Sequence, residues 1–203
     1  MQIYKGTDNL PSWEKPVVAV GAFDGVHLGH VRILKFLREQ ASKVGGTSVV
    51  LTFDPHPRTV LRHDSGFFTI NSLEKNLELI EKQGVDVVVV LPFSLEFSKL
   101  SYQQFVQDFM IGTLHAHTIV MGPNHAFGHH REGHHDNIKA LCSDNGLQVV
   151  DIPEEMWHDA GVHSAVIREH IRQQDWEMVN AMLGYTYSIQ NSQLGTKKTD
   201  IKI

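Results

Sequence analysis

The sequence predicts an α/β protein in which a parallel β-sheet carries helices on both faces. Short runs rich in β-branched residues alternate with longer amphipathic stretches along most of the 203 residues. These runs are apolar at consecutive positions, which is typical of strands buried on both faces of a parallel sheet. With 41% hydrophobic and 20% charged residues, the composition excludes wholesale disorder. The length suits one domain, or one domain with a small annex.

The expected strands and helices follow in order along the chain. Strands are expected at residues 17–23, 47–53, 85–91, 118–121 and 148–152. Helices are expected at about 28–43, 71–83, 101–113, 135–144, 164–173 and 175–183. Gly45 should end the first helix. Asn71 and Ser101 each precede a Glu or Gln by three residues, so each is expected to begin a helix with a capping box.

Ligands of parallel sheets bind beyond the carboxyl ends of the strands. The loops expected to form a site are therefore those that follow strands, at 24–30, 54–66, 92–100, 122–134 and 153–164. Residues 190–203 are polar and lack periodicity, which favours a tail. We therefore expect one domain over residues 1–189.

Charge and cysteine content exclude several classes of function. The net charge of −5 argues against a broad nucleic-acid-binding surface. The single cysteine, Cys142, excludes an intrachain disulfide and multi-cysteine metal sites. No secretory leader and no apolar run of membrane-spanning length is visible, so we expect a cytoplasmic protein that does not bind membranes. The Walker, dinucleotide-binding and His-Glu-x-x-His motifs do not occur.

The chemistry is concentrated in residues 23–30, Phe-Asp-Gly-Val-His-Leu-Gly-His. His27 and His30 stand three residues apart at a helix start, so both rings can point the same way. The helix N-terminus offers unpaired N–H groups and a positive dipole end, and Gly29 lets a phosphate approach the backbone closely. The pattern favours stabilisation of charge on a phosphorus transition state. The alternative is two surface histidines in a glycine-rich turn.

Six segments together resemble a known family. Gly21-x-Phe-Asp-Gly-Val-His-Leu-Gly-His30 resembles the nucleotidylyltransferase signature in the form found in bacterial FAD synthetases. Similar to further motifs of that family, in the same order, are Leu51-Thr-Phe-Asp-Pro-His-Pro57, Leu91-Pro-Phe-x-x-Glu-Phe97, Gly122-Pro-Asn-x-x-Phe-Gly128, Ser164-x-x-Ile-Arg168 and Met182-Leu-Gly-x-x-Tyr187. The resemblance spans about residues 1–189 and implies a Rossmann-like sheet of the nucleotidylyltransferase type.

This resemblance implies an FMN adenylyltransferase that transfers AMP from ATP to FMN, giving FAD and pyrophosphate, with Mg²⁺ accompanying ATP. It implies His27, His30 and Arg168 as catalytic residues. It implies nucleotide binding by Gly21, Phe23, Asp24, Gly25, Gly29, Asn124 and Ser164. It implies a flavin or substrate loop containing Phe53, Asp54, His56 and Phe127, and no metal ligand from the protein. From the residues alone, the loop at 53–57 could equally be a rigid turn, and Phe93, Phe97 and Phe105 are expected in the core.

The chain departs from the family's pattern in three places. The riboflavin kinase signature that usually follows this module is absent, so we expect no kinase activity, and a separate riboflavin kinase is a candidate partner that supplies FMN. His163-Ser164-Ala165 stands where the family has Ser-Ser-Thr, and residues 124–128 read Asn-His-Ala-Phe-Gly. These changes leave two alternatives open: a related transferase with another phosphorylated acceptor, or a degenerate regulatory protein that binds nucleotide or flavin.

Histidines are concentrated after the fourth expected strand. Seven of the 14 lie between His115 and His135, several of them around Arg131. Three interpretations are open for the loop at 125–135: it faces phosphate, it binds a metal such as zinc, or it is a solvated loop. The first predicts activity that depends on pH between about 6 and 7, where imidazole titrates.

Overall fold

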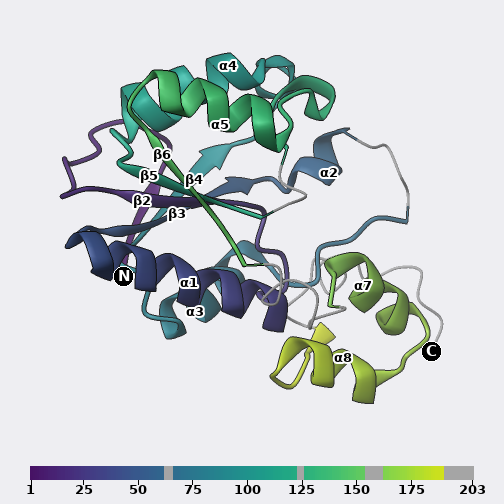
Figure 1. Cartoon of the computed structure of the whole chain (residues 1–203). Helices are drawn as coiled ribbons and strands as arrows, with labels where there is room; N and C mark the ends of the chain where they lie inside the picture. The colour runs from purple at the N-terminus through teal and green to yellow at the C-terminus, as the bar shows by residue number, and fades with distance from the viewer. Residues whose placement is uncertain (62–65, 123–125, 154–161, 190–203) are drawn as a thin grey trace.

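The computed structural model describes residues 1–61, 66–122, 126–153 and 162–189. A six-stranded sheet runs through this part of the chain, and all neighbouring strands are parallel. In spatial order the strands are β1 (Gln2–Lys5), β4 (Val87–Pro92), β3 (Ser48–Asp54), β2 (Val17–Val20), β5 (Thr118–Met121) and β6 (Gln148–Asp151). The predicted α/β fold with a parallel sheet is confirmed (Figure 1).

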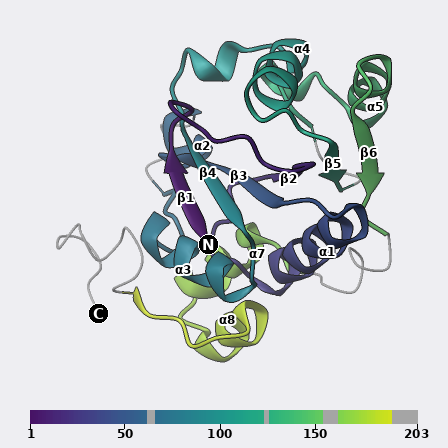
Figure 2. The ribbon, with the colours of Figure 1, turned by 90° about the vertical axis from the view of Figure 1, so that its left-hand side faces the viewer.

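Helices cover both faces of the sheet, as Figures 1 and 2 show. One face carries α1 (Leu28–Val44) and α3 (Leu73–Lys82). The other carries α4 (Tyr102–Phe105), the π-helix η2 (Val106–Thr113) and α5 (His135–Asp144). Two further helices, α7 (Ser164–Arg172) and α8 (Trp176–Leu183), pack against each other beside the start of α1.

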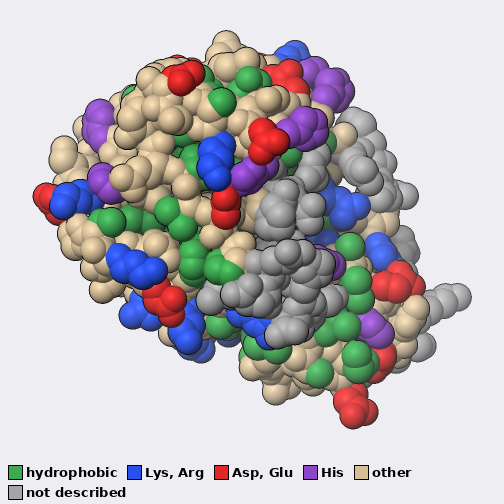
Figure 3. Space-filling model, in the orientation of Figure 1, with side chains coloured by type: hydrophobic (Ala, Val, Ile, Leu, Met, Phe, Trp, Pro, Cys, Tyr) green, Lys and Arg blue, Asp and Glu red, His purple; other side chains and the backbone are tan. Residues whose placement is uncertain are grey.

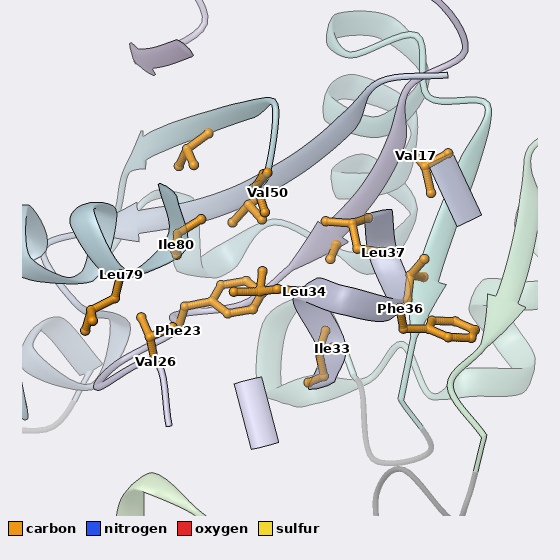
Figure 4. Close-up of a cluster of buried hydrophobic side chains, with 14 of the residues drawn as sticks. Val17, Phe23, Val26, Ile33, Leu34, Phe36, Leu37, Val50, Leu79 and Ile80 are labelled. Atoms are coloured by element: carbon orange, nitrogen blue, oxygen red, sulfur yellow. The ribbon is translucent and has the colours of Figure 1, made fainter. Parts of the chain in front are cut away.

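Two buried clusters, one on each face, hold these layers together. Alternate side chains of a strand point to opposite faces. Val50 and Val88 therefore pack with α1 and α3, and Figure 4 shows Val50 near Leu34 and Ile80. Their neighbours on β3 and β4 pack with η2 and α5 on the opposite face. Burial of both sets explains why the central strands are apolar at consecutive positions.

Local sequence signals explain where the first long helix begins and ends. His27 caps α1, because its Nδ1 accepts a hydrogen bond from the His30 backbone N–H at 3.3 Å. Gly45 ends the helix in the left-handed region with φ of 62°. Ser101 and Gln104 form the expected capping box at the start of α4. That helix continues to Thr113 as predicted, but with π geometry from Val106 onward.

Two predicted boundaries are wrong. The strand expected to reach residue 23 ends at Val20, because Phe23 turns into the left-handed region with φ of 46°. The helix expected to be capped by Asn71 is capped instead by Ser72, whose side chain accepts a hydrogen bond from the Lys75 backbone N–H. Asn71 is 2% exposed and points into the protein.

Four short elements lie where the sequence predicts loops or gives no signal, and one of them is the 3₁₀-helix η3 (His129–Arg131). β1 pairs with β4 at the edge of the sheet. α2 (Pro57–Leu61) and the 3₁₀-helix η1 (Phe97–Lys99) follow β3 and β4. Among the described helices, none has the length and apolar character needed to cross a bilayer.

The strand order fixes where a ligand can bind. From β2 the sheet grows in one direction through β3 and β4, and then returns to the other side of β2 with β5. The gap beyond the carboxyl ends of β2 and β5 is the switch point of such a sheet, where ligands bind. The loop at 21–27 leaves β2 at this point.

Candidate functional site

The loop between β2 and α1 has an unusual backbone. Phe23, Gly25 and Val26 all have positive φ, at 46°, 82° and 36°. Positive φ is uncommon for a residue with a side chain and is an outlier for a β-branched one such as Val26. Phe23 is 3% exposed and belongs to the core cluster. Its ring packs beside the His30 ring, with the two centroids 5.2 Å apart. The surrounding structure must therefore impose this conformation.

A buried ion pair holds the loop from the side of α7. The Arg168 guanidinium donates to the Asp24 carboxylate through Nη2, and its Nε donates to the Phe68 carbonyl at 2.8 Å. The Asp24 carboxylate also accepts the backbone N–H of Ile70 at 2.9 Å and of Asn71 at 3.3 Å. Burial raises the pKa of Asp24, and Arg168 and these backbone groups oppose that shift. Both side chains are nearly inaccessible, so Asp24 meets Arg168 and not solvent.

The two histidines of the loop lie in contact. Their rings stack with centroids 3.7 Å apart and planes 17° from parallel. Burial, and then His163 and Arg168, lower the pKa of His27 to about 4. Burial, together with His27 and His163, lowers the pKa of His30 well below its ordinary value. Both imidazoles are therefore neutral at pH 7. Since Nδ1 of His27 accepts a hydrogen bond, its proton is on Nε2, where it can be donated.

Gly29 and Ser164 bring the start of α7 against this pair. A Cβ on Gly29 would lie 3.1 Å from the His27 ring and 3.3 Å from the Val162 carbonyl oxygen. The Ser164 hydroxyl donates to the Asp24 carbonyl at 3.1 Å. The missing side chain at Gly29 thus permits close packing of two elements that lie far apart in the sequence.

The loop after β3 reaches the same place. His56 lies 5.0 Å from Phe67 between ring centroids, and its Nδ1 accepts the Arg58 backbone N–H at 3.1 Å. Phe67 also contacts the guanidinium groups of Arg58 at 4.9 Å and Arg168 at 4.7 Å. Burial, and then Arg168 and Arg58, lower the pKa of His56 to about 4. Asp54 is the last residue of β3, directly before this loop, and is exposed.

An aromatic cavity of about 510 Å³ opens on the other side of this loop. Its volume is within the range typical of small-molecule sites. The cavity is lined by Gly21, Phe53, Pro57, Phe93, Phe97, Phe105, Phe127, His129 and His130, among others. Phe53 meets Phe93 and Phe97 edge to face at 5.6 and 5.8 Å. Phe105 is 4% exposed, as expected for the core. Phe97 is half-buried, packs against the core cluster and also lines the cavity. The expectation is corrected for Phe93, which is half-buried, lines the cavity and lies outside that cluster.

The histidine-rich loop is only partly described. His125 and Asn124 lie outside the described residues. His129 and His130 line the cavity, whereas His135 pairs with Asp151 at 2.5 Å. Figure 3 shows histidine side chains gathered near α5. The hydrogen bond to Asp151 is the main cause that raises the pKa of His135. Within the described ranges, no three His, Cys, Asp or Glu side chains are grouped to hold a metal.

Comparisons with known proteins identify the family of this chain. The family model described as FAD synthetase matches residues 10–166. The chain belongs to the FAD synthetase family. Similar curated proteins are the bifunctional riboflavin kinase/FMN adenylyltransferases of Listeria monocytogenes, at 35% identity over 87% of this chain and 56% of the relative, and of Bacillus subtilis, at 34% over 87% and 55%. The Escherichia coli protein of that name is 25% identical over 93% of this chain.

This member of the FAD synthetase family spans just over half the length of those relatives. A solved structure described as a macrolide-efflux protein from Streptococcus pneumoniae superposes with a TM-score of 0.77. It is 22% identical over 91% of this chain and 60% of its own length. At that identity the likeness supports the fold alone.

Sequence reasoning missed four residues that the structure brings to the site. The ring of Phe67 contacts the guanidinium groups of both Arg58 and Arg168. Asn76 and Tyr185 bond to the backbone of Gly25. Asn76 carried a signal, because it is a polar residue on the buried face of an amphipathic helix. Nothing local marks the other three, since their roles depend on contacts with distant segments.

Proposed function

We propose that this chain is an FMN adenylyltransferase that makes FAD and pyrophosphate from FMN and ATP, without riboflavin kinase activity. Its membership of the FAD synthetase family supports this proposal. The observation that carries it is the aromatic cavity beside the paired histidines, since Gly21 belongs both to the cavity wall and to the loop that leads to His27. The flat ring of FMN needs an aromatic cavity, and the phosphates of FMN and ATP need an adjoining site with hydrogen-bond donors.

The proposed reaction is a displacement at phosphorus. A phosphate oxygen of FMN attacks the α-phosphorus of ATP, and the bond from that phosphorus to the oxygen bridging the α- and β-phosphates breaks. The electron pair of that bond leaves with pyrophosphate, so no covalent intermediate with the protein is needed. Catalysis of this kind depends on positioning and on stabilisation of charge.

The loop and its neighbours would supply both. Neutral His27 and His30 can donate hydrogen bonds to phosphate oxygens, at the positive end of the α1 dipole. Arg168 would add a fixed positive charge held in place by Asp24, and Ser164 would fix the loop. Asp24 acts here through Arg168. Gly21, Gly25 and Gly29 allow close approach, and Asn124 keeps a role by family resemblance alone.

The flavin ring would occupy the aromatic cavity. Phe53, Phe97 and Phe127 line it, and rings in offset or edge-to-face contact favour a flat aromatic guest. His56 on the loop after β3, and Asp54 directly before that loop, lie between this cavity and Arg168, where the phosphate of FMN would meet ATP. This arrangement favours FMN over phosphorylated acceptors that have no large aromatic ring to bury.

Magnesium would accompany ATP. Asp24 is fully engaged by Arg168 and by backbone N–H groups, and the described residues contain no preformed group of metal ligands. Mg²⁺ commonly keeps several waters and is held largely by substrate phosphates. We therefore expect Mg²⁺ to neutralise phosphate charge as MgATP, while the residues named above bind and orient the phosphates.

The deciding experiment incubates the full chain with FMN, ATP and Mg²⁺ and measures FAD and pyrophosphate after chromatographic separation. FAD should appear with an equal amount of pyrophosphate, and His30→Ala should reduce the rate by at least a hundredfold. A parallel reaction with riboflavin in place of FMN should give no FMN. Equal product from wild type and His30→Ala, or ATP binding without any turnover, would contradict the proposal.

A further inference from the structure

The backbone N–H and the carbonyl of Gly25 are each hydrogen-bonded to a side chain that the proposed mechanism does not use. The Gly25 N–H donates to Oδ1 of Asn76 on α3 at 3.0 Å. The Gly25 carbonyl accepts the Tyr185 hydroxyl at 2.7 Å. Gly25 is buried and belongs to neither a strand nor a helix, so no regular element satisfies these two groups.

Asn71 joins these two hydrogen bonds into one network. Its Nδ2 donates to the Tyr185 hydroxyl at 2.7 Å and to Oδ1 of Asn76 at 3.3 Å. Asn71 is 2% exposed and Asn76 is 8% exposed. Tyr185 is half-buried. Hydrogen bonds to buried partners fix geometry strongly, because Asn71 and Asn76 have little access to water as an alternative partner.

The segment that carries Tyr185 also contacts the loop beyond the histidine. A Cβ on Gly184 would lie 2.6 Å from the side chain of Leu28, the first residue of α1. Tyr185 and Gly184 thus touch residues on both sides of His27. Between these contacts the loop holds Val26 at positive φ, a conformation that would relax if it were not held.

We propose that Tyr185 is a positioning residue for the stacked pair of His27 and His30, acting with Asn76 through the backbone of Gly25. The inference rests on the proposed function only for its effect on turnover. Burial raises the pKa of the Tyr185 hydroxyl, so it stays protonated and donates its hydrogen bond throughout the ordinary pH range. The segment after α8 therefore belongs to the site because it holds the loop that carries His27, although it contributes no reacting group.

The test compares Tyr185→Phe with wild type in the full chain. This variant keeps the packed ring and removes one hydroxyl. We expect kcat to fall about tenfold to a hundredfold, because a small misplacement of catalytic groups is enough for that loss, while KM for ATP and for FMN stays within about twofold. Tyr4→Phe makes the same change on β1, where the hydroxyl bonds Gln2, and should leave kcat unchanged.

Two measurements do not depend on turnover. Hydrogen exchange of the Gly25 amide should quicken in Tyr185→Phe, and the pKa of His27 followed by NMR should rise from about 4 toward 6.5 as the loop loosens and water enters. Asn76→Ala breaks the network from the α3 side, should give the same pattern, and serves if Tyr185→Phe fails to fold. If wild type makes no FAD, the proposed function fails, and these two measurements alone decide the positioning role.

The inference is overturned if Tyr185→Phe and Asn76→Ala lower only the free energy of unfolding. In that case both variants would keep kcat within twofold of wild type, with unchanged Gly25 exchange and an unchanged His27 titration.

Discussion

At the scale of single residues, the site is built from charges that have no access to water. Arg168 is 4% exposed and Asp24 is 2% exposed, and each uses the other as its counter-ion. Removing one member of such a pair leaves an uncompensated buried charge, which costs far more than the pair contributes relative to apolar residues. Burial is the main cause that keeps His27 and His56 neutral, and the same guanidinium adds to the effect in both.

Replacement of Arg168 by Met should therefore destabilise the fold strongly. We expect the free energy of unfolding in urea to fall by about 3–5 kcal/mol, because the Asp24 carboxylate would lose its ionic partner. Arg172→Met is the matched control one turn further along α7. Arg172 is exposed, pairs with Glu169 at the surface, donates to the Gly66 carbonyl at 2.9 Å and lies over the Phe68 ring. Because the group keeps access to water, its loss should cost about 1 kcal/mol. Equal losses in both variants would show that the buried pair has no special role.

At the scale of elements, the ends of strands and the starts of helices carry the site. The carboxyl ends of β3 and β4 bring Phe53 and Phe93 together, η1 adds Phe97, and α4 adds Phe105. The π-helix η2 continues α4 and packs Val106 and Met110 beneath the sheet. The aromatic cavity therefore depends on the relative placement of several elements, none of which contains it alone.

Phe97→Leu tests whether this cavity binds the flavin. Loss of one aromatic contact should raise KM for FMN about three- to tenfold, with little effect on KM for ATP, because aromatic pairs contribute about 0.5–1.5 kcal/mol beyond burial. Phe36→Leu makes the same change in the core cluster on the opposite face and should leave both KM values unchanged. If Phe97→Leu raised KM for ATP and KM for FMN by the same factor, the cavity would not be a specific site for the flavin ring.

The end of α1 allows a second test at this scale. Gly45 is left-handed with φ of 62°, and nothing lies within 4 Å of a Cβ added there. Gly45→Ala should therefore cost only the backbone penalty of about 1–2 kcal/mol. At Gly46 an added Cβ would lie 2.2 Å from the Lys15 carbonyl oxygen, so Gly46→Ala should cost more, because the backbone itself must move. Thermal denaturation would rank the two variants, and the reverse order would contradict this account.

At the scale of the whole molecule, the site draws on segments from nearly the full length of the described chain. Residues 23–30, the loops after β3 and before α3, and the helices α7 and α8 converge at the switch point of the sheet. This convergence buries several histidines together, so protonation of the site and stability of the fold are linked. A fall in pH should therefore act on the molecule as a whole.

The free energy of unfolding should decrease as the pH falls from about 6.5 toward 4. His27 and His56 each have a pKa of about 4 in the folded state and about 6.5 when unfolded, so the unfolded chain binds more protons in this window. Their contribution is complete above pH 6.5 and is lost toward pH 4, by up to about 3 kcal/mol for each residue. Urea denaturation at several pH values measures this slope.

His56→Asn is the control for that slope. It should shrink the change in stability between pH 6.5 and pH 4, and an identical slope in wild type and variant would exclude the linkage for His56. The expected dependence of activity on pH between 6 and 7 cannot come from His27 or His56, since both titrate near 4. If it is observed, it comes from groups other than these two.

Much of this could be predicted from local sequence. Strand and helix alternation identified β2 to β6 and the long helices, because burial on a sheet or a helix leaves a periodic trace. β1 gave no signal, since a four-residue edge strand with mixed polarity has almost no period. Phe23 was assigned to a strand because it is apolar, whereas its left-handed backbone is imposed by contacts with other segments.

By itself, the sequence determined the order of the elements, the pairing of His27 and His30 at a helix start, and the family resemblance. These depend on spacing within a few residues, which a helix or strand converts directly into geometry. Only the tertiary structure decided that Arg168 pairs with Asp24, that Phe93 and Phe97 face a cavity, and that Tyr185 bonds Gly25 across 160 positions of the chain. Such contacts follow from how buried surfaces pack against one another, and no local pattern records the identity of a distant partner.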